Sequence, residues 1–289
     1  MQPLFCGDPM FEILSAKSTA RDIYEFEIHA PEIAAKAHPG QFVILRLHEK
    51  AERIPLTLKD WDARKGTVAI VFQALGKSTF ELSKLKKGDS VRDLIGPLGM
   101  APRVEKYGTA VVVAGGCGAA PALPRARAIK AAGNHLITIL GARQQDLLVC
   151  ELELGRISDE LYITTDDGSK GTKGVITVKL KELLDQGRHI DYVFTVGPPI
   201  MMKFVAATTK PFGIKTECSL NPIMVDGTGM CGACRVEVGG ETKFACVDGP
   251  EFDAHQVNFD LLMKRLETYK SQEKAALEHY QQGCACASH

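Results

Sequence analysis

The sequence contains no apolar run that approaches the roughly 20 residues of a membrane-spanning helix, so no membrane span is expected. Its 35 basic and 35 acidic residues cancel, which removes any bulk electrostatic attraction to nucleic acid or to an anionic membrane. Residues 1–10 lack the charged start and apolar centre of a secretory signal, and no internal repeat is visible. What remains is the composition of an ordinary globular protein, with 45% hydrophobic and 24% charged residues.

Nine cysteines form an odd and partly clustered set. This pattern fits metal ligation in a reducing compartment better than a framework of disulfides, so we expect a cytoplasmic protein. A chain of 289 residues can form two domains and a small third one.

The most informative stretch has the spacing D-x4-C-x2-C-x11-C, formed by Asp226, Cys231, Cys234 and Cys246. A plant-type [2Fe–2S] site has the spacing C-x4-C-x2-C and a distant fourth cysteine, so a carboxylate here takes the place of the first thiolate. Glycines between these positions allow the positive φ angles of a loop that wraps a cluster. The pattern therefore predicts a [2Fe–2S] cluster held by these four residues.

Two alternatives stay open at this stretch. One C-x2-C pair plus two further ligands is also typical of a structural zinc site. Cys218, eight positions before Asp226, is the competing candidate for the fourth cluster ligand.

Short strands and turns dominate from residue 11 to residue 98. Residues 22–28 alternate polar and apolar, while residues 41–47 and 67–72 are rich in β-branched and aromatic side chains. Strands at such short intervals predict a small antiparallel β-barrel.

Two segments of this region could hold a phosphate. Arg53-Ile-Pro-Leu-Thr combines a cation, a stiff bend and a hydroxyl, and Gly76-Lys-Ser-Thr opens a predicted helix whose free N–H groups could hold a pyrophosphate. Each segment taken alone is equally compatible with an exposed turn or a helix cap.

From residue 109 the pattern changes to that of a parallel sheet. Residues 109–114 form a continuous apolar run, which is typical of a strand buried on both faces. Further apolar runs at 135–140, 161–165 and 192–196 are separated by helical segments. These runs predict a five-stranded, doubly wound α/β domain.

A glycine turn, Gly115-Gly-Cys-Gly, follows the first of these strands and precedes a helix. Such a turn lets a dinucleotide phosphate approach the helix N-terminus, although it could also be merely a tight connection. Asp166 and Asp167, after the third strand, could bind ribose hydroxyls and would repel a 2′-phosphate. Arg143, after the second strand, would attract one, so these residues leave NAD and NADP both open.

In the C-terminal region, the spacing of the apolar residues predicts one helix over residues 257–282. Its apolar side is formed by Leu261, Leu262, Leu266 and Tyr269. Cys284 and Cys286 are interpreted as free thiols at a frayed end.

The run Glu217-Cys-Ser-Leu-Asn-Pro-Ile-Met-Val-Asp-Gly-Thr-Gly-Met-Cys-Gly-Ala-Cys-Arg-Val, with Phe244-Ala-Cys-Val-Asp-Gly-Pro-Glu-Phe, resembles the electron-transfer subunits of dihydroorotate dehydrogenase. It is still more similar to the small subunits of NADH-dependent reduced ferredoxin:NADP⁺ oxidoreductase, which are also named sulfide dehydrogenase subunits. The aspartate at position 226 matches the second branch, since the dihydroorotate relatives have cysteine there. The resemblance covers nearly the whole chain.

This resemblance implies a ferredoxin reductase-like flavoprotein with three parts: an FAD-binding antiparallel β-barrel at 1–102, an α/β doubly wound NAD(P)-binding domain at 103–217, and a small [2Fe–2S] domain with a C-terminal helix at 218–289. The implied FAD residues are Arg53, Pro55, Leu56, Thr57, Ile70, Val71, Phe72, Gly76, Ser78 and Thr79. The implied NAD(H) residues, with NADP(H) as the alternative nucleotide, are Gly115, Gly116, Gly118, Ala119, Pro121, Gly141, Ala142, Arg143, Asp166, Asp167, Gly197 and Pro198.

The resemblance also implies an activity. Hydride would pass between NAD(H) and FAD by stacking of the two rings, which requires no catalytic acid–base residue. Single electrons would then pass through the cluster to a larger flavoprotein subunit with FAD and [4Fe–4S] clusters, and indirectly to ferredoxin, in a bifurcating reaction of NADH, NADPH and ferredoxin. Alternatives are a subunit of a sulfide or dihydroorotate dehydrogenase and, in a different class, a zinc-containing module that senses nucleotides.

Overall fold

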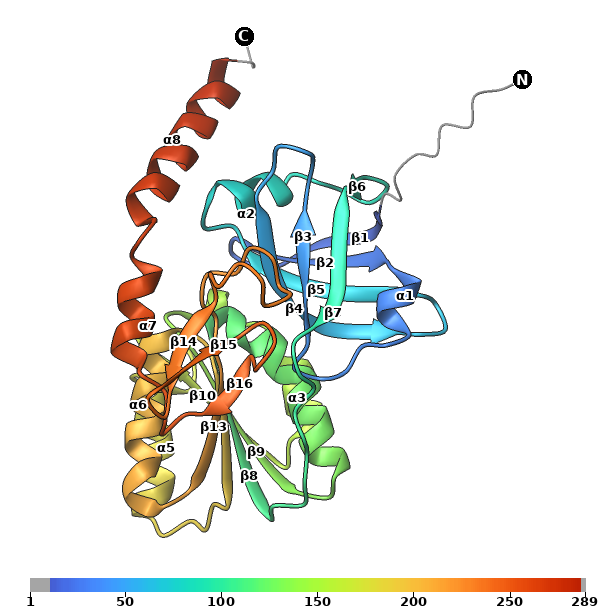
Figure 1. Ribbon diagram of the computed structural model, residues 1–289. Helices are drawn as coiled ribbons and strands as arrows, with labels where there is room; N and C mark the ends of the chain where they lie inside the picture. Colours follow the sequence, from blue (N-terminus) through green and yellow to red (C-terminus); the bar gives the residue numbers. More distant parts are fainter. Residues whose placement is uncertain (1–10, 287–289) are drawn as a thin grey trace, which may run out of the picture.

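The computed structural model describes the backbone of residues 11–286 and the side chains of residues 11–282. The expectations about residues 1–10 and about the thiols of Cys284 and Cys286 fall outside these ranges. The described elements form three parts: a barrel, a mixed α/β part, and a third part that contains the 226–246 segment and the last two helices (Figure 1).

The first part is a nearly closed antiparallel sheet, as predicted. Its strand order is β6-β1-β2-β5-β4-β3-β7. The inward-facing residues, among them Ile13, Phe26, Val43 and Leu58, are fully buried in one core. Its elements are β1 (Phe11–Ala20), β2 (Ile23–His29), α1 (Pro31–Ala34), β3 (Phe42–Arg46), β4 (Arg53–Asp62), β5 (Thr67–Gln73), α2 (Lys77–Leu82), β6 (Ser90–Val91) and β7 (Asp93–Leu98).

The second part is built on a sheet with the order β11-β10-β9-β8-β12-β13-β16. Its pairs are parallel except for the pair of β13 and β16. The elements are β8 (Thr109–Gly115), η1 (Gly116–Gly118), α3 (Ala119–Ala131), β9 (His135–Ala142), η2 (Gln145–Leu147), α4 (Glu151–Ile157), β10 (Glu160–Thr165), β11 (Thr172–Lys173), α5 (Ile176–Asp185), β12 (Tyr192–Val196), α6 (Pro199–Thr209), η3 (Lys210–Phe212), β13 (Lys215–Ser219) and β16 (Glu251–Asp253).

Strand β8 shows why this sheet is covered on both faces. Its side chains alternate between two buried clusters: Ala110 and Val112 pack with α3 and α4, whereas Val111 and Val113 pack with α5 and α6. A strand whose two faces are both covered is apolar throughout. The doubly wound arrangement predicted from the continuous apolar run is therefore confirmed.

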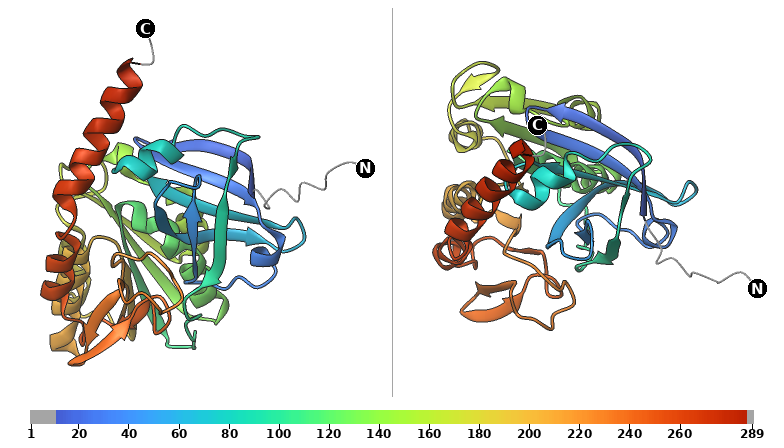
Figure 2. Two further views of the ribbon diagram at one scale, coloured as in Figure 1. Left: turned by 45° about the horizontal axis from the view of Figure 1, so that its top comes forward. Right: turned by 90° about the horizontal axis from the view of Figure 1, so that it is seen from above.

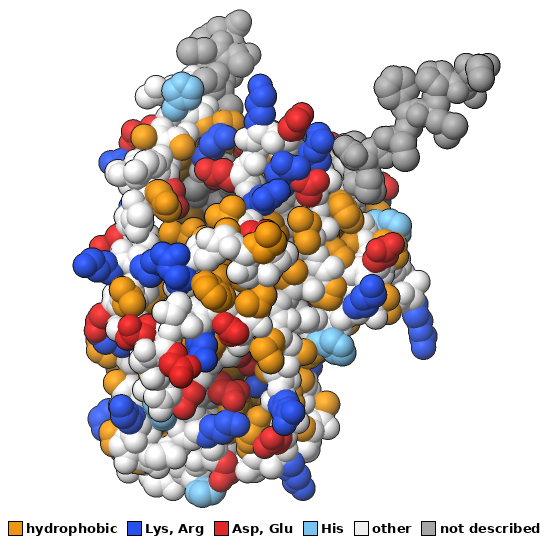
Figure 3. Space-filling view, viewed as in Figure 1, with side chains coloured by type: hydrophobic (Ala, Val, Ile, Leu, Met, Phe, Trp, Pro, Cys, Tyr) orange, Lys and Arg blue, Asp and Glu red, His pale blue; other side chains and the backbone are white. Residues whose placement is uncertain are grey.

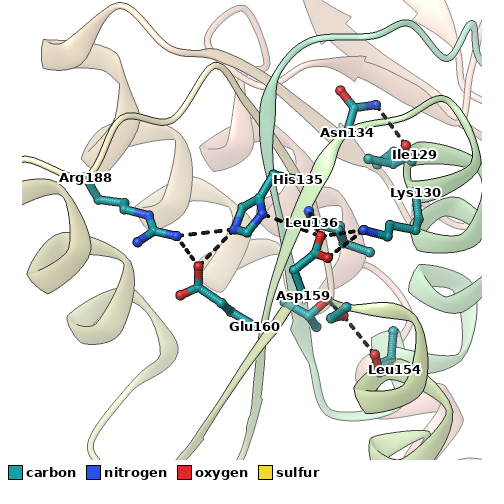
Figure 4. A network of polar contacts seen from close by, with 11 residues as sticks. Ile129, Lys130, Asn134, His135, Leu136, Leu154, Asp159, Glu160 and Arg188 are labelled. Carbon is teal, nitrogen blue, oxygen red and sulfur yellow. Dashed lines mark hydrogen bonds and ion pairs between the residues drawn. The ribbon is translucent and has the colours of Figure 1, made fainter.

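Polar side chains tie together the amino ends of β9 and β10 (Figure 4). The Glu160 carboxylate lies 2.9 Å from His135 Nε2 and also accepts a hydrogen bond from the Arg188 guanidinium. The Asp159 carboxylate accepts a hydrogen bond from the Lys130 ammonium at 2.6 Å. These pairs are partly exposed and lie at the opposite end of the strands from the glycine turns. They join β9 and β10 to α3 and to the turn after α5 at this end of the sheet.

The third part adds a hairpin, β14 (Arg235–Val238) and β15 (Glu241–Phe244), and the helices α7 (Phe259–Leu266) and α8 (Lys270–Cys286). It lies beside both other parts, and α8 runs from α7 toward α2 (Figure 2), where the Tyr280 and Phe80 rings are 6.1 Å apart. None of the helices in the described part of the chain combines the length and apolar character that a bilayer crossing requires.

The single helix predicted over 257–282 is wrong. The N–H groups of Glu267, Thr268 and Lys270 bond to carbonyls three residues back, so the helix tightens and breaks between α7 and α8. The residues predicted to share one side of that helix also differ in burial. Leu262 in α7 is buried, whereas Leu261 in α7 and Tyr269 in the break are exposed.

The third part is joined to the large sheet rather than appended to it. Strand β13 runs through the expected boundary at 217–218, and β16 pairs with it antiparallel, with Ser219 opposite Glu251. The cluster segment therefore takes its position from the sheet.

Candidate functional site

The turns after the parallel strands converge at one edge of the sheet. Gly115 is paired with Gly141 across β8 and β9, and the turn after β8 lies against the end of β12. A Cβ on Gly118 would lie 2.6 Å from the Val196 carbonyl oxygen, so a side chain is excluded there. Gly116 has a φ of +56° and open space where a Cβ would stand. This edge leaves backbone free for the close approach of a ligand, as a dinucleotide phosphate requires.

The remaining residues predicted for NAD(H) lie at the same edge. Arg143, Asp166 and Asp167 are exposed beyond β9 and β10. Asp167 accepts hydrogen bonds from the Ser169 hydroxyl at 2.6 Å and N–H at 2.9 Å, and these bonds lower its pKa. The others are Ala119 and Pro121 in the first turn of α3, Ala142 at the end of β9, and Gly197 and Pro198 before α6. The structure thus brings together the residues that the sequence places in three separate turns.

The barrel residues predicted for the flavin divide into two groups. Arg53 is exposed, and Pro55, Leu56 and Thr57 are half-buried along β4. Ile70 and Phe72, by contrast, point into the barrel core, so only their backbone is available to a ligand. Val71 faces the opposite way, into the core shared with α3.

The hydroxyls at the start of α2 already have protein partners. Thr79 Oγ1 accepts the N–H groups of Leu75 and Gly76, each at 3.1 Å, and the Ser78 hydroxyl donates to the Glu52 carboxylate. A bound phosphate at this turn would have to exchange these bonds for its own.

The cysteine loop places two of its four predicted ligands together. Cys234 and Cys246 are buried, and their sulfurs are 3.2 Å apart. Cys231 is exposed, and the Asp226 carboxylate bonds to the hydroxyl and N–H of Thr228. Among the described residues, no three His, Cys, Asp or Glu side chains converge closely enough to hold a metal ion.

The chemistry of this pair fits a thiolate-bound cluster. Burial, and then the neighbouring Cys234, raise the pKa of the Cys246 thiol to about 12, while the Gly229 N–H acts in the opposite direction. An iron centre offsets such a cost because it binds the deprotonated sulfur. Cys218, the alternative ligand, is completely buried on β13, and burial raises its pKa well above the ordinary value.

The cysteine loop packs directly on the barrel. Gly227 has a φ of +82°, and a Cβ there would lie 2.7 Å from Leu98 Cδ1 and 2.9 Å from Ile44 Cγ1. The Met100 N–H donates to the Gly249 carbonyl at 2.7 Å. The hydrogen bonds from Thr228 chiefly lower the pKa of Asp226, and the positive charge of Arg53 adds to this effect. The barrel end with the predicted flavin residue therefore adjoins the predicted cluster loop.

Sequence reasoning missed a set of charges between the barrel and the α/β part. The Lys59 ammonium, on a side chain only 8% exposed, contacts Glu25 of the barrel at 2.5 Å and Glu153 of α4 at 3.0 Å. These groups line a cavity of about 350 Å³ together with Val71 and Cys150. No strand is predicted around Lys59, and no local pattern in the sequence marks this contact.

Comparisons with known proteins identify the family. Residues 221–258 match the profile of the iron–sulfur cluster binding domain of dihydroorotate dehydrogenase B, and this range contains all four predicted ligands. An electron transfer subunit homolog of dihydroorotate dehydrogenase B (NAD⁺) from Thermotoga maritima is 49% identical over 95% of this chain and 96% of its own length. The chain belongs to this family of electron-transfer subunits.

More distant members and solved structures agree. The dihydroorotate dehydrogenase B electron transfer subunit of Desulforamulus reducens is 34% identical over 85% of this chain and 96% of its own length. A chain in the structure of the NADH-dependent reduced ferredoxin-NADP oxidoreductase, a flavin-based electron-bifurcating enzyme, is 48% identical with a TM-score of 0.89, and covers 96% of this chain and 100% of that chain. A ferredoxin NADP⁺ reductase from Neisseria gonorrhoeae is 18% identical with a TM-score of 0.60, over 73% of this chain and 98% of that chain, and shows the fold alone.

The comparisons confirm the family resemblance and the iron–sulfur domain that the sequence predicted. They do not support the alternative of a structural zinc site. The individual ligands and nucleotide-binding residues stay predictions.

Proposed function

We propose that this electron-transfer subunit passes hydride between NAD(H) and FAD, and single electrons through a [2Fe–2S] cluster to a larger flavoprotein partner with its own FAD and [4Fe–4S] clusters. The observation that carries the proposal is the packing of the cysteine loop on the barrel, where Gly227 fits between Leu98 and Ile44. The flavin would accept a pair of electrons and the cluster one at a time, so the two sites must adjoin.

The residues of the chain would bind and position these groups. The open backbone at Gly116 and the N-terminus of α3 would hold the nucleotide pyrophosphate, and the exposed Arg53 would neutralise a flavin phosphate. Cys231, Cys234, Cys246 and Asp226 would hold the cluster, which requires Asp226 to exchange its bonds to Thr228 for iron.

The overall reaction that we favour couples NADH, NADPH and ferredoxin by electron bifurcation. Its support is the 48% identity, over 96% of this chain, to a chain of the ferredoxin-NADP oxidoreductase, together with the aspartate at position 226. A dihydroorotate dehydrogenase B electron transfer subunit homolog is equally similar, at 49%, whereas a relative named as the subunit itself is 34% identical. The alternative is that this subunit transfers electrons for a dihydroorotate or sulfide dehydrogenase, and the partner experiment below distinguishes the two.

The cluster end is the proposed docking surface for the larger subunit. Met230 is 86% exposed, and Val225 and Val247 are 44% and 39% exposed on the same loop region. Hydrophobic side chains gather on the face of the molecule where this region meets the barrel (Figure 3). Partner contact here would place the cluster between the two flavins. We infer a cytoplasmic location for this two-subunit enzyme, because its clustered cysteines suit a reducing compartment.

The test is anaerobic purification of the chain with its native partners. We expect flavin and iron–sulfur absorption, no zinc, and two irons per electron-transfer subunit in addition to the irons of the partner's [4Fe–4S] clusters. NADH should bleach the flavin, and the reduced cluster should give an EPR signal. The co-purified protein, identified by mass spectrometry, should be a flavoprotein with [4Fe–4S] clusters. A colourless, zinc-containing protein would contradict the proposal, and a dihydroorotate-oxidising partner would select the alternative.

A further inference from the structure

A charged cluster lies in the α/β part, beneath the Gly40 segment of the barrel. Arg125, in α3, is 0% exposed. Its guanidinium is 3.0 Å from Glu217 Oε2 on β13 and 3.1 Å from Glu251 Oε2 on β16. One buried cation therefore faces two carboxylates, and the exposed Lys215 ammonium lies 3.4 Å from Glu217. Glu251 thus shares the Arg125 charge with Glu217, and no second cation lies beside it among these ion pairs of the described residues.

Glu251 is the less well satisfied of the two carboxylates. Glu217 also receives the Tyr192 hydroxyl at 2.5 Å and is partly open to solvent. Neither Glu251 oxygen has a partner with hydrogen-bond geometry among the described residues, although the ion-pair distance to Arg125 is short. A buried carboxylate in this position favours the protonated form.

The position of Glu251 places it near the proposed cluster loop in the chain and beneath the barrel. It follows Cys246 by five positions, on a strand held to β13 by the pair Ser219–Glu251. Its Oε1 lies 2.7 Å from where a Cβ of Gly40 would stand, so the barrel closes over it. In Figure 1, β16 lies beside α3 and below the barrel.

The charged and titratable groups around Glu251 come from four elements. They are Arg125 on α3, Glu217, Lys215 and the buried thiol of Cys218 on β13, Tyr192 on β12 stacked on Tyr107, and Asp253 on β16 itself. Burial first, and then Glu217, raise the pKa of Glu251 to about 7 against the opposing effect of Arg125. The Glu251 carboxyl would therefore gain or lose its proton near neutral pH.

We propose that Glu251 is a redox-linked proton acceptor, which takes up a proton when an electron arrives in the 226–246 segment and releases it when the electron leaves. The electron comes from the flavin reduced by NADH, and the proton comes from solvent. One O–H bond forms on the Glu251 carboxylate, giving the neutral acid, and the same bond breaks when the electron passes to the partner. The inference rests on the proposed function.

The size of the coupling follows from chain geometry. Five residues span at most about 17 Å. A unit negative charge at that distance, in a medium of effective dielectric constant about 20, raises the proton affinity of a carboxylate roughly fivefold. A fivefold change corresponds to about 40 mV in the potential of a one-electron centre, at 59 mV per factor of ten. A shorter separation would increase the effect.

The test is a redox titration of the cluster in the holoprotein, followed by EPR, at pH values from 5.5 to 8.5. We expect the potential to fall by about 40 mV or more as the pH rises through neutrality, and to become independent of pH in Glu251→Gln. Glu217→Gln is the matched control, because it removes a carboxylate from the same guanidinium. Since Glu217 raises the pKa of Glu251, this variant should keep the slope and shift it to lower pH.

A second measurement covers the case in which Glu251→Gln does not fold. Reduced-minus-oxidised infrared spectra of the wild-type protein with ¹³C-labelled glutamate should show a protonated carboxyl band that appears on reduction. A cluster whose potential is flat with pH, a slope that persists in Glu251→Gln, or no labelled carboxyl band would overturn the inference. Absence of any cluster signal would instead overturn the proposed function.

Discussion

Replacing Gly227 by alanine tests the contact between the cysteine loop and the barrel. A residue other than glycine at a φ of +82° costs about 1–2 kcal/mol. The new methyl would also lie 2.7 Å from Leu98 Cδ1 and 2.9 Å from Ile44 Cγ1, and forcing a methyl into a packed site costs about 1–3 kcal/mol. Because Ile44 is buried in the core and cannot retreat, we expect a loss of about 2–5 kcal/mol in all.

Gly232→Ala is the matched control. It lies in the same loop with a φ of +67°, but its nearest neighbour is the flexible end of Arg235 at 3.2 Å, away from the barrel. We expect this variant to lose only the conformational cost, about 1–2 kcal/mol. The difference between the two variants, about 1–3 kcal/mol, then measures the contact with the barrel.

The assay combines denaturant unfolding with stopped-flow reduction by NADH. Strain at Gly227 can be relieved by lifting the loop from the barrel, which would slow cluster reduction after flavin reduction, whereas Gly232→Ala should leave that step unchanged. Equal stability losses in both variants, together with unchanged cluster reduction, would refute the reasoning that this contact sets the separation of the two sites.

Three further variants test other contacts. Lys59→Met should lower the free energy of unfolding by about 2–3 kcal/mol, because Glu25 and Glu153 lose their shared cation while staying partly solvated; an unchanged urea midpoint would argue against this link between barrel and α/β part. The pKa of Glu251 rises from 4.5 to about 7 on folding, so the native state binds more protons in this window and stability falls as pH rises through it. The wild-type protein should therefore lose about 3 kcal/mol relative to Glu251→Gln between pH 4.5 and 7, and parallel pH curves would disprove the assignment. Asp226→Cys should still assemble a cluster but with an altered potential and EPR spectrum, since thiolate is a softer ligand than carboxylate; identical spectra would show that Asp226 is not a ligand.

Much of the architecture was predictable because it depends on local patterns. The alternation of residues 22–28 predicts a barrel strand, and the apolar run 109–114 predicts a strand buried on both faces, since side chains alternate along any strand whatever its neighbours. The glycine turn at 115–118 and the cysteine spacing at 226–246 are likewise short-range patterns. Each is limited by backbone geometry within a few residues.

Other features were decided by contacts between distant segments. Nothing local marks the three residues of β16 as a strand, and they become one only by pairing with β13. The charge on Arg125 interrupts an apolar helix, but the two carboxylates that receive it are 92 and 126 positions away in the chain. Sequence patterns determined which elements form, because those depend on neighbours in the chain. Burial and tertiary packing decided which charges face each other and which loop rests on the barrel.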